Sequence, residues 1–171
     1  LAERNGQHAK QLLQQALVLH PEDGRVHSTM GMACMLMREP EPAQRHLELA
    51  LTRIPEHVGT WHALGWTRLL RGDRASALEA FREALDRDRN FAESHGAVGL
   101  LLALQGQPAQ AHHHLELADR LDATNVTGRY ARALLAGHAG DAARLNALAM
   151  RLLDRPGFFG GRLSESVAGD Q

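Results

Sequence analysis

The sequence predicts an all-α protein in which antiparallel helix hairpins stack side by side as a solenoid. Three observations predict this fold class: equivalent positions recur with a fixed period, apolar residues lie three and four apart within each unit, and the composition favours helices. Hydrophobic residues make up 44% of the 171 residues and aromatic residues only 4%, so alanine and leucine supply most of the apolar side chains. Strands favour β-branched and aromatic residues, whereas alanine and leucine favour helices.

The period is clearest at three evenly spaced glycines, each of which ends a short motif. After each glycine an alanine, a large apolar residue and a second alanine follow in the same order and at the same three offsets. We expect these small and large residues to let the two helices of a hairpin approach closely and interdigitate. The motifs are His27-x-x-Met30-Gly31, Trp61-x-x-Leu64-Gly65 and His95-x-x-Val98-Gly99. The residues that follow them are Ala43, Ala77 and Ala111; Leu47, Phe81 and Leu115; and Ala50, Ala84 and Ala118.

The period also predicts where each unit begins and ends. Gly72-Asp73 predicts a left-handed stop for one helix and a side-chain cap for the next, and Gly140-Asp141 occupies the same position two repeats later. A single hairpin cannot bury both of its faces, so we expect the hairpins to stack. The predicted segments are the second helix of a truncated repeat (1–23), three repeats (24–57, 58–91 and 92–125), a degenerate capping repeat (126–156) and a flexible tail (157–171).

This pattern resembles the tetratricopeptide repeat, in which an aromatic residue, leucine-glycine, alanine, a bulky residue, alanine and proline recur within a unit of about 34 residues. The resemblance covers roughly residues 7–155. It implies a right-handed superhelix in which the first helix of each hairpin lines a concave, ligand-binding groove. The chain departs from the family pattern at five positions: His27, His95 and Arg129 replace the usual tryptophan, and Arg89 and Ala123 replace the closing proline.

The resemblance places an apolar stripe in this groove, made of Met32, Trp66, Leu100 and Leu134, which recur with the period of the repeat. It implies that a peptide or amphipathic helix of a partner protein binds there, with Trp66 as the anchor and methionines that adapt to the ligand. The chain would then be a protein-interaction scaffold. The predicted partner-binding residues are Met32, Met35, His62, Trp66, Leu69, Leu100, Tyr130 and Leu134.

Two other interpretations of the stripe stay open. Its residues could form the core between repeats, because first helices in solenoids are buried on more than one side. The groove could instead be filled by the C-terminal tail, which carries Phe158 and Phe159, from the same chain or a neighbouring one. An unfilled apolar stripe favours self-association through the groove or the tail.

Several classes of function are not expected. A net charge of -1 provides no basic field for nucleic acid, and the longest apolar run, residues 97–104, is far shorter than the ~20 residues that span a membrane. The consecutive residues His112, His113 and His114 point about 100° apart on a helix, so they should lie on a solvated face rather than converge on a metal. Cys34 has the position of a small core residue. We therefore expect no enzyme activity, catalytic residue, cofactor or metal.

The same residues leave the specific role open. Besides a scaffold, the chain could be a chaperone for a secreted or pilus-type subunit, or a structural spacer or regulatory arm of a larger envelope or enzyme protein. Arginine greatly outnumbers lysine, which suggests a bacterial source and leaves cytoplasm and periplasm open. We expect His27 and His95 to be packed and hydrogen-bonded, and packed histidines to resist charging, so that stability falls below about pH 6.

Overall fold

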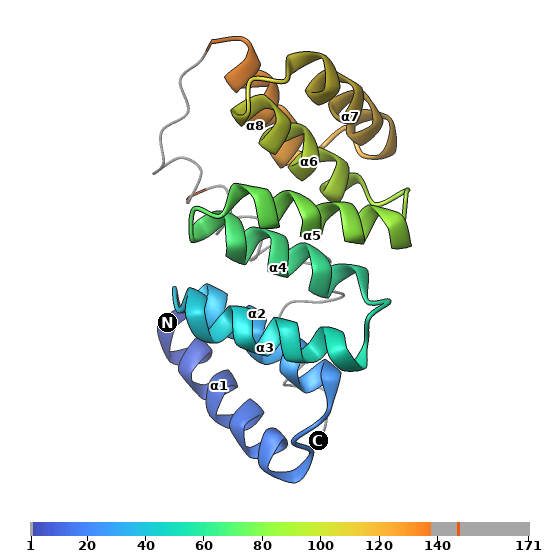
Figure 1. Ribbon diagram of the computed structural model, residues 1–171. Coiled ribbons are helices and arrows are strands. Elements are labelled where there is room, and N and C mark those ends of the chain that lie inside the picture. Colours follow the sequence, from blue (N-terminus) through green and yellow to red (C-terminus); the bar gives the residue numbers. More distant parts are fainter. Residues whose placement is uncertain (1, 138–146, 148–171) are drawn as a thin grey trace.

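The computed structural model describes residues 2–137 and Ala147, with side chains described from residue 7 onward. Within residues 2–137 it contains eight α-helices, stacked from α1 at one end to α7 and α8 at the other (Figure 1). Residues 138–146 and 148–171, which include most of the predicted capping repeat and all of the tail, lie outside the described residues. The helices are α1 (Ala2–Leu19), α2 (Gly24–Leu36), α3 (Pro40–Arg53), α4 (Val58–Leu70), α5 (Arg74–Arg87), α6 (Ala92–Leu104), α7 (Pro108–Leu121) and α8 (Val126–Leu135).

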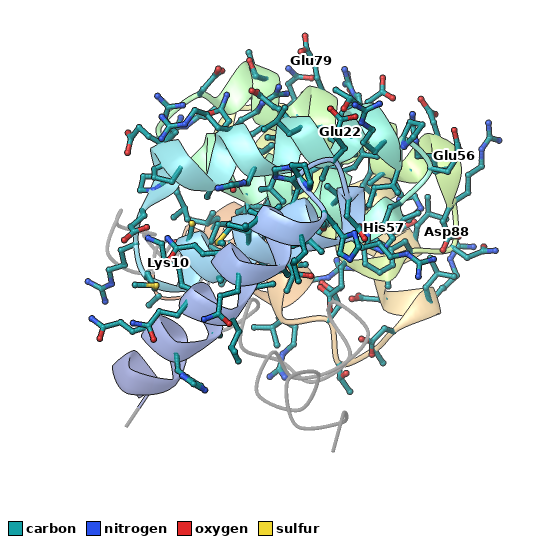
Figure 2. The ribbon with its side chains drawn as sticks, turned by 90° about the horizontal axis from the view of Figure 1, so that it is seen from below. Lys10, Glu22, Glu56, His57, Glu79 and Asp88 are labelled. Carbon is teal, nitrogen blue, oxygen red and sulfur yellow. The ribbon has the colours of Figure 1, made fainter. Side chains whose placement is uncertain are left out.

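The helices pair in chain order. The three hairpins α2–α3, α4–α5 and α6–α7 are antiparallel, and α3 packs on α4 as α5 packs on α6. At the ends of the stack, α1 packs on α2, and α8 packs on both α6 and α7. The part of the chain that the structure describes has no β-strand and no helix long and apolar enough to cross a membrane. Charged side chains such as Glu22, Glu56 and Glu79 project outward from the stack (Figure 2).

Side chains and backbone geometry explain the helix ends. Asp23, His57, Asp73 and Asn125 each accept a hydrogen bond from a backbone N–H in the first turn of the helix that follows. Gly72 has φ +86°, which confirms the predicted left-handed stop before Asp73.

The last described helix ends earlier than the period of the repeat predicts. α8 ends at Leu135 and is followed by Gly137 at φ +79°, ahead of Gly140, where the period places the stop. Glycine enters the left-handed region at little cost, so the first glycine after the helix can end it. The first complete repeat differs in another way: Arg38 stands in the slot of Gly72 and adopts φ 60° although it has a side chain.

The predicted interdigitation of small and large residues is confirmed. A Cβ atom on Gly65 would lie 2.5 Å from Cε1 of Phe81, which is fully buried. Only a residue without a side chain lets α4 and α5 approach this closely, so the glycine of each motif is a packing requirement. The equivalent pairs are Gly31 with Leu47 and Gly99 with Leu115, where the added Cβ would lie 2.6 Å from the leucine.

Candidate functional site

The structure buries most of the predicted groove residues. Six of the eight are 0–5% exposed, and all of these except His62 belong to the hydrophobic core cluster. Tyr130 and Leu134 on α8 are partly buried and pack against that cluster. Three of the four residues of the predicted apolar stripe are therefore buried, and partner contact at all eight predicted positions stays a prediction. The buried six are Met32, Met35, His62, Trp66, Leu69 and Leu100.

The apolar character of α6 on every side explains the burial of Leu100. A helix that is apolar on every side is buried, whereas a groove-lining helix keeps a polar face. Leu100, Leu101 and Leu102 are consecutive, point in three directions and are each at most 1% exposed. In the described part of the chain α6 packs against α5, α7 and α8.

His62 lies in a buried polar contact between α4 and α6. The indole N–H of Trp66 donates to Nε2 of His62 over 3.0 Å, so Nδ1 carries the proton and donates to Ser94 Oγ over 3.1 Å. The rings of Phe81 and Phe91 pack around the imidazole. Burial lowers the pKa of His62 to about 3, so this histidine is neutral at physiological pH.

Similar polar contacts join each first helix to the next. In each, a residue bonds to one that lies 32 positions later in the sequence. The Ser28 and Thr60 hydroxyls lie 2.7 Å apart between α2 and α4, and Asn125 Nδ2 donates to Glu93 Oε2 over 2.9 Å at the start of α8. With His62 and Ser94, these contacts link all four described first helices.

The aromatic slot of each complete repeat keeps one hydrogen bond, although its residue type changes. A ring N–H donates to the backbone carbonyl of the residue six positions earlier. His27 and His95 are 9% and 7% exposed, so the prediction that they are packed and hydrogen-bonded is confirmed. The three bonds are His27 Nε2 to Pro21 (2.9 Å), Trp61 Nε1 to Pro55 (2.7 Å) and His95 Nε2 to Arg89 (3.0 Å).

Each of these two histidines also pairs with a second histidine that sequence reasoning missed. Nδ1 of His95 lies 3.0 Å from Nδ1 of His114, and His27 lies at the same distance from His46. Because His95 donates from Nε2, its Nδ1 accepts and His114 donates. Burial, followed by the adjacent His95 ring, which disfavours a second charge, lowers the pKa of His114 to about 4, and burial also lowers the pKa of His46.

The histidine pairs correct one prediction and show a sequence pattern that could have indicated them. His112 and His113 are exposed as predicted, but His114 is half-buried against His95 rather than solvated. The second histidine follows the slot histidine at the same sequence separation in both pairs. In the middle repeat, where the slot holds Trp61, the equivalent of the second histidine is the fully buried Ala80, which leaves room for the larger ring.

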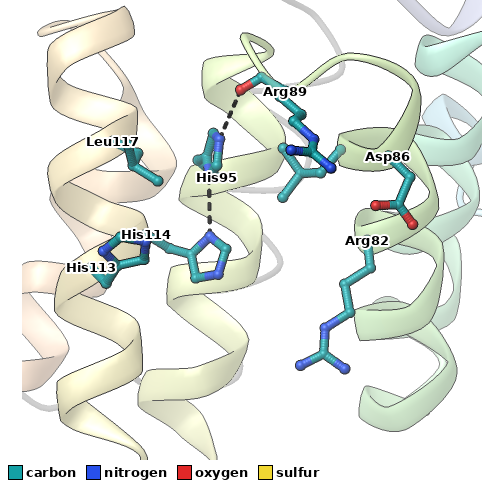
Figure 3. A pocket seen from close by; sticks show the side chains of 8 residues that line it. Arg82, Asp86, Arg89, His95, His113, His114 and Leu117 are labelled. Carbon is teal, nitrogen blue, oxygen red and sulfur yellow. Dashed lines mark hydrogen bonds between the residues drawn. The ribbon is translucent and has the colours of Figure 1, made fainter.

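The His95–His114 pair lines an open cleft between α5, α6 and α7 (Figure 3). The cleft has a volume of about 510 Å³. Arg82 and Arg89 are exposed at its edge, and among the described residues neither guanidinium forms a salt bridge. The lining residues are Arg82, Leu85, Asp86, Arg89, His95, His113, His114 and Leu117.

The described residues offer little for metal binding or nucleophilic chemistry. Within residues 7–137, no group of three or more His, Cys, Asp or Glu side chains could hold a metal ion. Cys34 is a free thiol, 1% exposed, and burial raises its pKa, which disfavours the reactive thiolate.

Comparison with known proteins gives matches at the level of fold. One solved structure of MamA superimposes with a TM-score of 0.64 at 19% sequence identity, and the match covers 69% of this chain and 64% of the MamA chain. A second structure of MamA gives a TM-score of 0.68 at 14% identity, and the match covers 92% of this chain and 85% of the MamA chain. YrrB, described as a TPR protein with an unusual peptide-binding site, gives a TM-score of 0.67 at 18% identity, covering 76% of this chain and 67% of its own. This chain thus spans less than two thirds of the first MamA chain. No curated protein sequence matches.

Residues 58–91, which hold α4 and α5, match the family model of the tetratricopeptide repeat. This span coincides with the second complete repeat that the period predicts. One repeat of the chain thus matches the tetratricopeptide family model, and the described chain has the all-α, right-handed superhelical solenoid fold that MamA and YrrB share.

Proposed function

We propose that this chain is a protein-interaction scaffold that binds a protein or peptide partner. The observation that carries the proposal is the tetratricopeptide solenoid, because stacked hairpins present an extended surface. The likeness to YrrB, a protein described as peptide-binding, supports it at the level of fold. The burial of His62 and Cys34, and the lowered pKa of His62, also support binding rather than catalysis.

The accessible part of the predicted groove lies at α8. Tyr130 and Leu134 keep partial exposure there, whereas the six buried contacts would require the core to open. A peptide or amphipathic helix in this groove would therefore contact α8 first. Substitution of Trp66 or Leu100 would test the core rather than binding, because both side chains are fully buried.

Affinity capture from a lysate of the source organism, followed by titration of the purified partner, tests this proposal. The wild-type chain is compared with Leu134→Glu and with Leu49→Glu, a matched substitution at a leucine of α3 that is 50% exposed. A partner that binds the wild type and Leu49→Glu, and binds Leu134→Glu at least about tenfold more weakly, supports the groove at α8. If the wild type retains no protein above a bead control, the scaffold proposal fails.

One observation favours a second candidate, a structural spacer in a larger protein. Burial of six of the eight predicted contacts leaves little of the groove free for a ligand. For a spacer, the wild type retains no partner, and cells that carry Leu134→Glu in the full-length protein grow and assemble as the wild type does. Loss of function by this variant, with its fold intact by circular dichroism, would contradict the spacer.

A further inference from the structure

We infer that the cleft between α5 and α7 binds an acidic segment of a partner protein, in which carboxylate side chains flank an apolar one. This inference rests on the proposed scaffold function and names the surface and the partner chemistry. The cleft is separate from the predicted concave contacts, none of which lines it.

The lining of the cleft matches such a segment in charge and polarity. Arg82 on α5 and Arg89 just after it supply two permanent positive charges, against the single carboxylate of Asp86 (Figure 3). Leu85 and Leu117 supply apolar surface from α5 and α7. A volume of about 510 Å³ accommodates several side chains of a peptide.

The charges at these positions differ from those of the preceding interval of the solenoid. The same repeat positions between α3 and α5 carry Glu48, Glu79 and Glu83, where the cleft has Arg82, His113 and Leu117. The α5–α7 interval therefore presents basic or apolar side chains at positions where the α3–α5 interval presents carboxylates.

The middle repeat also differs in the space that it leaves. Trp61 occupies the slot of His95, and the Arg87 guanidinium lies 4.8 Å from the centre of its ring. Arg87 is also paired with Glu83, at 2.6 Å, so its charge is already compensated. In the α5–α7 interval this position holds the smaller imidazole of His95, which leaves space for a ligand. Arg82 and Arg89 form no salt bridge with the described residues, so their charges are available to it.

The interior of the cleft is unfavourable to further positive charge. Burial, followed by the neighbouring groups of His95, His113 and Arg82, lowers the pKa of His114 to about 4, so this imidazole is neutral at physiological pH. A carboxylate that enters the cleft would meet the permanent positive charges of Arg82 and Arg89 and form charge-assisted hydrogen bonds with their guanidinium groups.

The surroundings favour a protein segment over nucleic acid. Phosphates continue along a nucleic acid strand, and next to the cleft such a strand would meet the carboxylate of Glu79 on α5. Glu79 projects from the surface (Figure 2). The chain as a whole carries a net charge of -1, which gives no long-range attraction for a polyanion. An acidic stretch in a protein can end where the basic cleft ends.

The test uses two fluorescein-labelled peptides, a leucine flanked on both sides by glutamates and the same peptide with glutamines, titrated with the full chain by fluorescence anisotropy. We expect the glutamate peptide to bind more tightly and its binding to weaken with added salt. Arg82→Glu/Arg89→Glu should weaken it by about tenfold or more, from two lost ion pairs and the reversed charges. Arg74→Glu reverses a single arginine charge at an exposed site of α5 outside the cleft and should alter affinity by less than about twofold.

Three outcomes overturn the inference: equal affinity for the two peptides, an Arg74→Glu effect as large as that of the double variant, or tighter binding of a single-stranded oligonucleotide of equal charge. Thermal melting verifies that the variants fold, as expected for substitutions at exposed residues. If the wild type captures a partner from lysate but does not distinguish the peptides, this inference fails and the scaffold function stands. If it neither captures a partner nor binds a peptide, both fail.

Discussion

Acid should destabilise this solenoid through His62. The imidazole is 1% exposed, accepts a hydrogen bond from Trp66 at Nε2 and donates one to Ser94 from Nδ1. A second proton would have to sit on Nε2, opposite an indole N–H that can only donate. Protonation would therefore break the Trp66 bond and leave a charge in the core.

The pKa of about 3 sets the size of the effect. The ordinary pKa is 6.5, so as pH falls below 6.5 the unfolded chain takes up a proton that the folded chain refuses until near pH 3. The stabilisation is thus fully present above about pH 6.5 and is lost progressively as pH falls toward 3. At 1.36 kcal/mol per unit, the free energy of unfolding should drop by about 2 kcal/mol between about pH 7.5 and pH 5 from this residue alone.

Urea unfolding at a series of pH values, followed by circular dichroism, measures this loss. His62→Gln should be less stable than the wild type at pH 7.5 but should lose about 2 kcal/mol less on going to pH 5, because the titrating group is gone. His112→Gln, at an exposed position of α7, should keep the wild-type pH dependence. If wild type and His62→Gln lose equal stability over this range, His62 is not the group that responds to acid.

Urea unfolding of three further sets of variants tests the packing and the backbone geometry of the repeats. Gly65→Ala should cost about 1–3 kcal/mol, because its Cβ would lie 2.5 Å from the Phe81 ring, and a cost below about 0.5 kcal/mol would contradict the close approach. Arg38→Gly should instead stabilise the chain by about 1 kcal/mol by relieving a left-handed φ of 60°, and a loss of stability would contradict that explanation. His95→Trp alone should cost about 1–3 kcal/mol through crowding, whereas His95→Trp with His114→Ala, which copies the middle repeat, should cost less; additive effects would contradict the pairing.

The fold could be predicted because the same residue types recur at equivalent positions in three consecutive repeats. The slots of Gly65 and Phe81 recur in register in the two neighbouring repeats, and each recurrence makes a chance pattern less credible. The close helix contact that explains the glycine is local to one hairpin, so the sequence spacing carries it directly.

The state of the groove could not be predicted in the same way. Exposure of Trp66 or Leu100 depends on everything that packs against the first helices, and the family pattern says only which side of the helix they occupy. One signal was present, because the uninterrupted apolar run at residues 97–104 is typical of a helix buried on all sides.

The sequence indicates the cleft between α5 and α7 less clearly than it indicates the repeats. Its lining residues come from α5 and α7, so Arg82 and His113 belong to different repeats and lie far apart in the sequence. Neither occupies a repeat slot, so the period does not draw attention to them. The clue would have been the recurrence of a second histidine at a constant separation from the slot histidine, as in His27 with His46 and His95 with His114.

The polar contacts between successive first helices differ in whether they respond to pH. Stability in a repeat protein is a sum of unit and nearest-neighbour terms, so a weakened interface becomes a boundary between cooperative units. The α2–α4 contact is a pair of hydroxyls, which do not titrate, whereas the α4–α6 contact depends on the neutral form of His62. In acid, amide hydrogen exchange should therefore separate into two blocks, with α1–α5 and α6–α8 opening independently.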